Sequence, residues 1–244
     1  MTLVRIALLA LAVLFLVPVA ISALLYATRA RGDWRMADRS SAGLLPPADA
    51  HPEAVLRILS ARTVSWRGIV ATHSWIVIKE HGARAYSRFD YTAWGQPIWV
   101  DRFVPDGFWF GNLPMVVFAA DGPEAEAMLP RIRQAVAEYR YNRPGDYVVW
   151  PGPNSNTFVA AVMAAVPEIR ASLPATAIGK DFPYDGRWVG LTPSQTGIRI
   201  NLGGYVGLTL GWVEGLELNL FGGVAGIDLR RPGIKLPALG RLGI

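Results

Sequence analysis

The hydrophobic pattern of the chain begins with one long apolar run at the N-terminus. Residues 6–27 contain no charged side chain, and about 20 such residues in a helix cross the hydrocarbon core of a bilayer. The apolar segment of a cleaved signal peptide is shorter, at about 7–15 residues. The pattern therefore predicts a retained transmembrane helix over residues 1–28, with cleavage at Ala20-Ile21-Ser22 as the alternative.

Beyond a polar, proline-containing linker over residues 29–53, the pattern changes to short runs rich in β-branched and aromatic residues. Four such runs lie within 53–63, 67–80, 83–94 and 97–104, and turn residues separate them. Runs of this length and composition are typical of strands. We therefore expect an antiparallel sheet in the first half of the chain.

Two helices are predicted after these strands. In the first, over residues 121–141, Asp121 is a suitable N-cap, Pro123 occupies the first turn, and apolar side chains recur at helical spacing. The second helix begins at Asn154 and ends near Pro167. The segment between them, over residues 143–150, is interpreted as a short strand or a loop.

The last third of the chain is rich in glycine. Apolar residues alternate with others over 203–226, which predicts strands, and Gly222-Gly223 predicts a turn between two of them. After Asp228 the only charged side chains are basic. This tail is interpreted either as a sheet edge with a solvated end or as a basic, apolar surface lying against a membrane.

These elements together predict an α+β fold. The expected parts are the transmembrane anchor, the linker, an α+β domain over residues 54–200, and a glycine-rich β segment with a basic tail over 201–244. Composition agrees with a membrane protein, because 52% of the residues are hydrophobic, 18% are charged and the net charge is +5. No dense run of Lys and Arg is interleaved with aromatic residues, so membrane lipid is the expected partner and nucleic acid is not.

The chain contains no cysteine, which excludes disulfides, thiolate zinc sites, iron–sulfur clusters and a cysteine nucleophile. Its three histidines, His51, His73 and His81, lack the spacing of metal ligands. The glycine-rich segment does not follow a nucleotide-binding pattern. The sequence therefore predicts neither a metal nor a cofactor.

Ser155 is the candidate nucleophile. Asn154 is a sound N-cap for the helix that follows, which leaves the hydroxyl of Ser155 free at the positive end of the helix dipole. That position stabilises negative charge on a nucleophile or an oxyanion. The alternative interpretation is that Asn154, Ser155, Asn156 and Thr157 only cap the helix.

His73 is the candidate general base. A hairpin turn centred on residues 81–82 aligns it with Asp90, with both side chains on the same face of the sheet. A carboxylate beside an imidazole fixes its tautomer and stabilises its protonated form. Glu80 and Asn112 are the alternative partners for His73.

The order of these residues resembles a known group of enzymes. A histidine on one strand, a polar residue on the next and a later nucleophile that opens a helix is the order in circularly permuted papain-like (NlpC/P60-like) domains. The segment "GPNSNTFV", residues 152–159, is similar to their asparagine–cysteine motif, with Ser155 in the place of the cysteine. The resemblance spans about residues 55–170 and implies a papain-like antiparallel sheet with packed helices. A serine in that place needs a well-positioned base when it attacks.

A second resemblance covers nearly the whole chain. The segments "WRGIVATHSWIVIK", "RPGDYVVWPGPNSNTFV" and "LGWVEGLELNLFGGVAGIDLRRPGIKLP" resemble the uncharacterised bacterial family called domain of unknown function 3750. It implies a membrane-associated bacterial protein and brings no established activity. We accordingly expect a single-pass protein of the inner membrane with its domain on the periplasmic side.

Two functional hypotheses stay open. In the first, the protein is a hydrolase or acyltransferase acting on amide or ester bonds in the envelope, with Ser155 as nucleophile, His73 as base and Asp90 as its orienting group. Asn154, Asn156 and Trp75 then contribute to substrate binding. In the second, the protein is a catalytically inactive relative that binds an envelope component or a protein partner.

Overall fold

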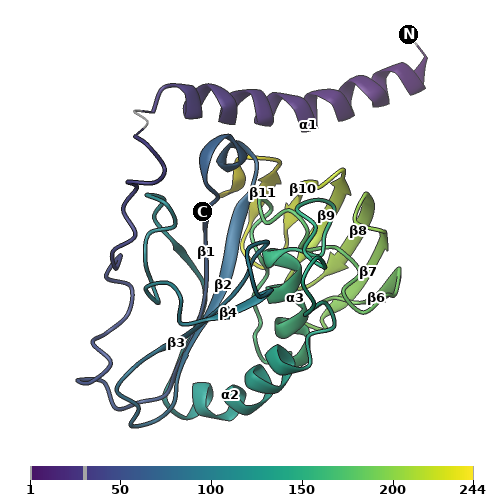
Figure 1. Ribbon diagram of the computed structural model, residues 1–244. Helices are drawn as coiled ribbons and strands as arrows, with labels where there is room; N and C mark the ends of the chain where they lie inside the picture. The colour runs from purple at the N-terminus through teal and green to yellow at the C-terminus, as the bar shows by residue number, and fades with distance from the viewer. Residues whose placement is uncertain (1, 30–31, 244) are drawn as a thin grey trace.

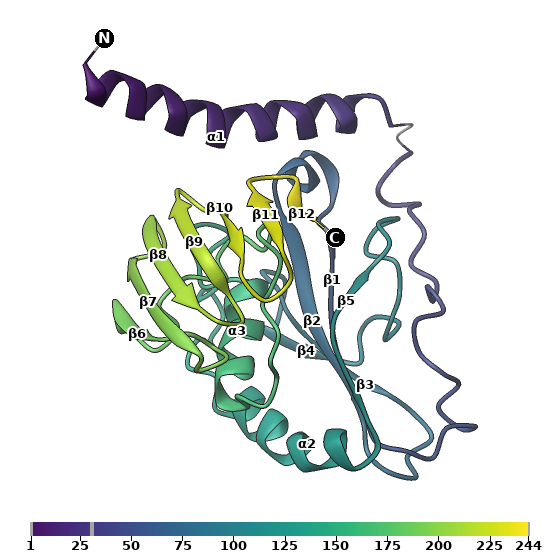
Figure 2. The same cartoon turned by 180° about the vertical axis from the view of Figure 1, so that it is seen from behind.

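Two antiparallel sheets, with helices packed against them, form the computed structural model, which describes residues 2–29 and 32–243 (Figure 1). A long N-terminal helix lies across one end of the molecule, at the opposite end from α2, in both views (Figures 1 and 2). The helices are α1 (Leu3–Ala27), the 3-10 helix η1 (Ser65–Ile69), α2 (Gly122–Ala137) and α3 (Ser155–Ala165).

The first sheet has five strands in the order β4-β3-β2-β1-β5. The four strands expected between residues 53 and 104 are confirmed, and a fifth that the sequence did not predict runs directly into α2. The strands are β1 (Val55–Arg62), β2 (Thr72–Lys79), β3 (Ser87–Tyr91), β4 (Ile98–Val100) and β5 (Met115–Asp121).

Both faces of the five-stranded sheet are buried. One face, which we call the helix face, carries alternate residues such as Ile58 and Ile76 and packs against α2 and α3 in the main core. The other, which we call the loop face, carries Leu59 and Trp75 and forms a second cluster with Trp109 and neighbouring loop residues. The two central strands therefore have no solvent-facing side.

The second sheet has seven strands in the order β12-β11-β10-β9-β8-β7-β6. The expected turn between β9 and β10 is present at Phe221-Gly222, one residue before the predicted Gly222-Gly223, because Gly223 already pairs with Leu220. The sheet begins before residue 200, the expected end of the preceding domain. The strands are β6 (Val189–Leu191), β7 (Gly197–Leu202), β8 (Val206–Gly211), β9 (Gly215–Leu220), β10 (Gly223–Asp228), β11 (Gly233–Leu236) and β12 (Gly240–Gly243).

The seven-stranded sheet carries its polar residues inward. Its inner face holds buried side chains that include Arg199, Asn201, Glu217 and Asn219. Its opposite side, which we call the outer face, consists of the exposed apolar side chains that alternate with them along β6 to β12. An antiparallel sheet with one solvated face normally shows the reverse distribution. On β7 and β8 the outer face comprises Ile198, Ile200, Leu202, Val206, Leu208 and Leu210.

Buried ion pairs connect this sheet to the segment after α3. Glu217 of β9 pairs with Lys180, and its Oε1 lies 2.5 Å from Nζ of Lys235 on β11. Lys180 also lies 3.1 Å from Asp181, whose carboxylate accepts a hydrogen bond of 2.8 Å from Asn219. Charged groups taken out of water require such partners. Lys235 of the basic tail is therefore an internal residue and not a surface charge.

The helix α3 begins where the sequence predicts, since Asn154 is its N-cap. Asp121 likewise occupies the N-cap position of α2, although its side chain makes no capping hydrogen bond. Residues 143–150, interpreted as a strand or a loop, form a loop. Among the described residues, α1 is the one helix long and apolar enough to cross a membrane.

Candidate functional site

The N-terminus of α3 is held by a complete capping arrangement. Oδ1 of Asn154 accepts the backbone N–H groups of Asn156 at 3.0 Å and Thr157 at 3.2 Å, while the Thr157 hydroxyl accepts the N–H of Asn154. The amide of Asn154 donates to the carbonyls of Val149 and Ile178. Asn154 is therefore a structural cap whose hydrogen-bonding groups are engaged within the protein, and the binding role expected for it stays a prediction.

Asn156 fixes α3 to the central strand of the first sheet. Its amide donates to the carbonyls of Thr72 at 2.9 Å and Ile178 at 2.8 Å, and its Oδ1 accepts the hydroxyl of Ser74 at 2.8 Å. Ser74 in turn meets the hydroxyl of Ser60 on β1 at 3.0 Å. The side chain is 2% exposed. Asn156 is thus the centre of a buried neutral network and is not accessible for binding.

Ser155 is buried beside Tyr147. The backbone N–H and the hydroxyl of Ser155 are both within hydrogen-bonding reach of the phenolic oxygen of Tyr147. Burial raises the pKa of Tyr147, and the hydrogen bonds from Ser155 offset part of that rise. A tyrosine with a raised pKa is protonated near neutral pH, so it cannot accept the proton of a serine hydroxyl as a general base.

His73 and Asp90 meet as the sequence predicts, in a different register. Ile76 pairs with Phe89, which aligns Asp90 with Trp75, two positions from the expected alignment with His73. A register shift of two residues leaves Asp90 on the same face of the sheet as His73. Asp90 therefore still reaches His73 diagonally, with 2.8 Å between its Oδ1 and Nε2 of His73. Glu80, the alternative partner of His73, pairs with Arg133 instead.

Arg88, which sequence reasoning missed, completes this cluster. Its Nε donates to Oδ2 of Asp90 at 2.7 Å and its terminal nitrogen to Oδ1 at 2.9 Å. Burial alone would raise the pKa of Asp90, but the charge and hydrogen bonds of Arg88, with the bond from His73, lower it. The sequence spacing could have predicted this contact, because residues 88 and 90 of a strand lie on the same face.

His73 lies in an aromatic layer. Its ring stacks on Trp109 with 3.9 Å between ring centroids, and Trp75 flanks it at 5.9 Å. Burial lowers the pKa of His73 more than Asp90 raises it, so the ring is neutral at pH 7 and donates its Nε2–H to Asp90. Trp75, expected to bind substrate, is fully buried, and its indole N–H donates to the carbonyl of Pro105.

The sheet separates the two halves of the predicted catalytic group. Side chains of β2 alternate, so Ser74 points to α3 on the helix face while His73 points to Trp109 on the loop face. Ser155, which opens α3, lies on the helix face. Ser155 and His73 therefore lie on opposite faces of the sheet, whereas His73 and Asp90 form a pair, and the catalytic role expected for the three stays a prediction.

A cavity of about 150 Å³ lies on the loop face, lined by Arg39, Arg102, Phe103 and Trp109 among others. Arg39 donates to three backbone carbonyls, and Arg102 stacks on Trp99 at 3.8 Å. Within residues 2–29 and 32–243 no group of three histidine or acidic side chains is placed to hold a metal ion. Arg88, which binds Asp90, and Trp109, which stacks on His73, also line this cavity.

Comparison with known proteins identifies one family. The family model described as "Protein of unknown function (DUF3750)" matches residues 53–182, more than half of the chain, and confirms the second resemblance seen in the sequence. The matched region begins just before β1 and ends after Lys180 and Asp181, so it includes the first sheet, α2 and α3. No curated protein and no solved structure matches the chain significantly. The papain-like resemblance stays a prediction.

Proposed function

We propose that this chain, which belongs to the DUF3750 family of proteins of unknown function, is a membrane-bound binding or structural protein of the bacterial cell envelope and not a serine hydrolase. The observation that carries the proposal is the surroundings of Ser155. Its hydroxyl meets a protonated tyrosine, and the imidazole of His73 belongs to the opposite face of the sheet.

Acyl transfer by a serine depends on removal of the hydroxyl proton at the moment of attack. A base within about 2.6–3.2 Å, or one water away, performs that step. The polar groups of β2 that Asn156 of α3 contacts are the hydroxyl of Ser74 and the carbonyl of Thr72, and Ser74 also contacts the hydroxyl of Ser60. None of these is basic enough to ionise a serine, which argues for the inactive alternative.

The polar residues at the start of α3 support a structural role. Asn154, Asn156 and Thr157 each hold backbone carbonyls of other segments, those of Val149, Ile178, Thr72 and Gly179, with bonds of 2.7–3.0 Å. A Cβ at Gly179 would lie 2.3 Å from the amide nitrogen of Asn154, so only glycine allows this close approach. The motif that resembles a catalytic one thus joins three segments.

The membrane part of the proposal rests on α1. This helix has 25 residues, and most of its side chains are exposed to the surroundings rather than buried in the domain. We propose that it is retained as a single anchor in the inner membrane, with the domain on the periplasmic side. After alkaline washing, the full-length protein should stay in the membrane fraction. A mature N-terminus just beyond Ser22 would show that the helix is a cleaved signal sequence.

A serine-reactive fluorophosphonate probe tests the catalytic question directly. We expect the full-length protein in its native membranes to show no labelling above that of Ser155→Ala. In cells that depend on the protein, Ser155→Ala should restore the wild-type envelope phenotype, whereas Asn156→Ala should fail because it loosens α3. Labelling that Ser155→Ala abolishes, together with loss of function in that folded variant, would establish a hydrolase instead.

A further inference from the structure

The outer face of the seven-stranded sheet is the most unusual surface of the protein. The register aligns Ile198 with Leu210, Ile200 with Leu208 and Leu202 with Val206. All six side chains are between 38% and 54% exposed. The pattern continues outward, since Leu208 and Leu210 align with Leu218 and Leu216 on β9. The result is an apolar surface that extends across several strands without a polar side chain.

The outer face is apolar along whole strands, because the polar side chains of these strands lie on the inner face. The polar side chains of the same strands point inward, where Arg199, Glu217 and Lys235 are buried in ion pairs. Burying these charges is costly compared with leaving them in water. Contiguous exposed apolar patches of this kind mark sites that bind a membrane or a partner. The outer face is therefore adapted to apolar surroundings.

We propose that the outer face lies in one leaflet of the lipid bilayer, beside α1. This inference rests on the proposed membrane anchoring and extends it, because it assigns the seven-stranded sheet, and not α1 alone, to the membrane. A six-residue strand is about 20 Å long, shorter than the roughly 30 Å hydrocarbon core. The sheet accordingly inserts its face into one leaflet and does not span.

Continuity with α1 identifies lipid as the occupant. α1 packs against β10 and β11, and Figure 1 shows it crossing the sheet near these strands. Phe15, at the middle of α1, touches the outer-face position of Gly223, where a Cβ would lie 3.3 Å from the phenyl ring. Because the contact involves the middle of the helix, an environment that surrounds α1 also reaches the outer face.

Aromatic side chains at the strand ends fit the same environment. Trp188, Tyr205 and Phe221 lie at one end of the strands and Trp212 lies at the other, and each is 45–68% exposed. Trp and Tyr are enriched where a membrane protein meets the headgroup region.

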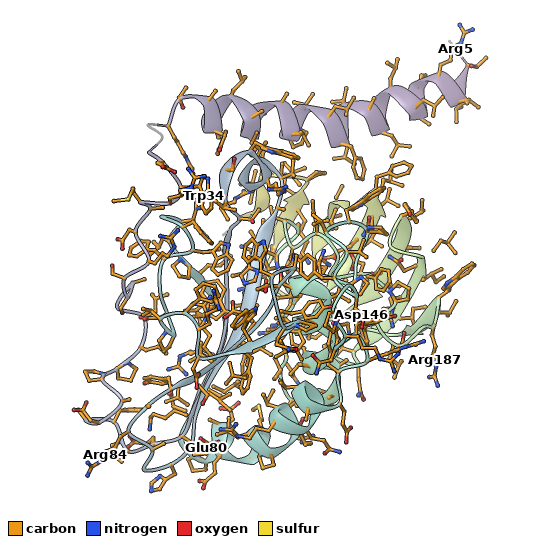
Figure 3. The ribbon with its side chains drawn as sticks, viewed as in Figure 1. Arg5, Trp34, Glu80, Arg84, Asp146 and Arg187 are labelled. Carbon is orange, nitrogen blue, oxygen red and sulfur yellow. The ribbon has the colours of Figure 1, made fainter. Side chains whose placement is uncertain are left out.

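Positive charge at the rim favours anionic headgroups. Arg187 precedes β6 and points away from the protein at the edge of the sheet (Figure 3), and Arg230 and Arg231 lie in the turn between β10 and β11. Exposed basic residues close to a membrane are attracted to anionic headgroups. Asp228 accepts contacts from Arg231 and Arg241, so Arg187 and Arg230 carry the larger share of this attraction.

The absence of cysteine makes the proposal testable with single-cysteine variants of the full-length protein. Leu208→Cys reports on the outer face and Leu16→Cys on the exposed side of α1. Arg84→Cys is the matched control, because Arg84 is exposed at the end of the molecule opposite α1 (Figure 3). Each variant is labelled with a small environment-sensitive fluorophore and reconstituted in vesicles of phosphatidylethanolamine and phosphatidylglycerol.

Two quenchers then locate each label. We expect nitroxide-bearing lipid to quench labels at positions 16 and 208 several-fold more than aqueous iodide does, with the reverse order at position 84. Iodide quenching at 208 with lipid quenching at 16 would overturn this inference while α1 stays an anchor. A label at 208 shielded from both quenchers would assign the face to a second copy of the chain. Lipid quenching at 208 alone would support the inference and refute the anchor.

Discussion

The two sheets of this protein distribute their apolar and polar side chains differently between their faces. In the five-stranded sheet both faces are buried, and the central side chains Leu59, Trp75, Ile58 and Ile76 are inaccessible to solvent. In the seven-stranded sheet the charged and amide side chains are inside and the aliphatic ones are outside. Alternation therefore identifies a strand, but it does not say which of its sides faces the protein.

The largest expected loss of unfolding free energy comes from the buried ion pairs on the inner face of the second sheet. Glu217 is 2% exposed and binds both Lys180 and Lys235. We expect Glu217→Gln to lower the free energy of unfolding by about 3–5 kcal/mol, because it leaves the buried Lys235 without its ion-pair partner, whereas Lys180 keeps Asp181. Guanidinium unfolding of the full-length protein in a non-ionic detergent, followed by tryptophan fluorescence, measures the loss.

Glu80→Gln is the matched control for that prediction. Glu80 pairs with Arg133 on the first domain, and both side chains are about half exposed. An exposed pair contributes about 0–1 kcal/mol. If Glu217→Gln and Glu80→Gln lowered the free energy of unfolding by the same small amount, water would have to reach the inner face of the second sheet. The interiors of the two sheets would then differ less than the burial of Glu217 indicates.

Much of the first sheet and of α3 could be predicted from the sequence. Turn residues separate β1 to β4, and Asn154 marks the start of α3. β5 was missed because it runs into α2 at Asp121 without a turn between them. The position of Ser155 relative to His73 could not be predicted, because both sides of β2 are buried and each mixes polar with apolar side chains, so the pattern gives no sign of which side faces α3.

The polar anchor of α3 provides the next largest expected effect. Asn156→Ala removes the partner of the Ser74 hydroxyl and of the carbonyls of Thr72 and Ile178. A buried polar group that loses its partner costs about 1–3 kcal/mol, and we expect a loss of that size in the same unfolding experiment. Ser155→Ala is the neighbouring control and should cost less, because the Asn154 cap survives. The reverse ranking would contradict the structural role given to Asn156.

The loop face of the first sheet should respond to pH. The pKa of His73 is lowered in the folded protein, chiefly by burial, so the unfolded chain binds more protons as the pH falls. The contribution of His73 to the free energy of unfolding is therefore fully present above about pH 6.5. It declines below that pH by at most about 1.4 kcal/mol per pH unit.

His73→Gln isolates this effect, because glutamine does not titrate and its amide can still donate to Asp90. We expect its stability to be flatter than that of the wild type between about pH 6.5 and pH 4.5. Below that range Asp90, whose pKa is also lowered, adds its own decline in both proteins. Parallel curves over the whole range would mean that folding does not lower the pKa of His73.

The smallest effect is expected for Leu208→Ala on the outer face, and comparing it with Leu59→Ala in the first sheet tests the contrast between the sheets most directly. Leu59 is fully buried on β1, so Leu59→Ala should lower the free energy of unfolding by about 2–5 kcal/mol. Leu208 is 47% exposed on the outer face, and in detergent Leu208→Ala should change it by less than about 0.5 kcal/mol, as is usual for surface substitutions. The same leucine-to-alanine change thus has different consequences on equally regular strands. A loss at Leu208 as large as at Leu59 would mean that protein covers the outer face in solution, because detergent or lipid leaves no fixed cavity when a side chain is shortened.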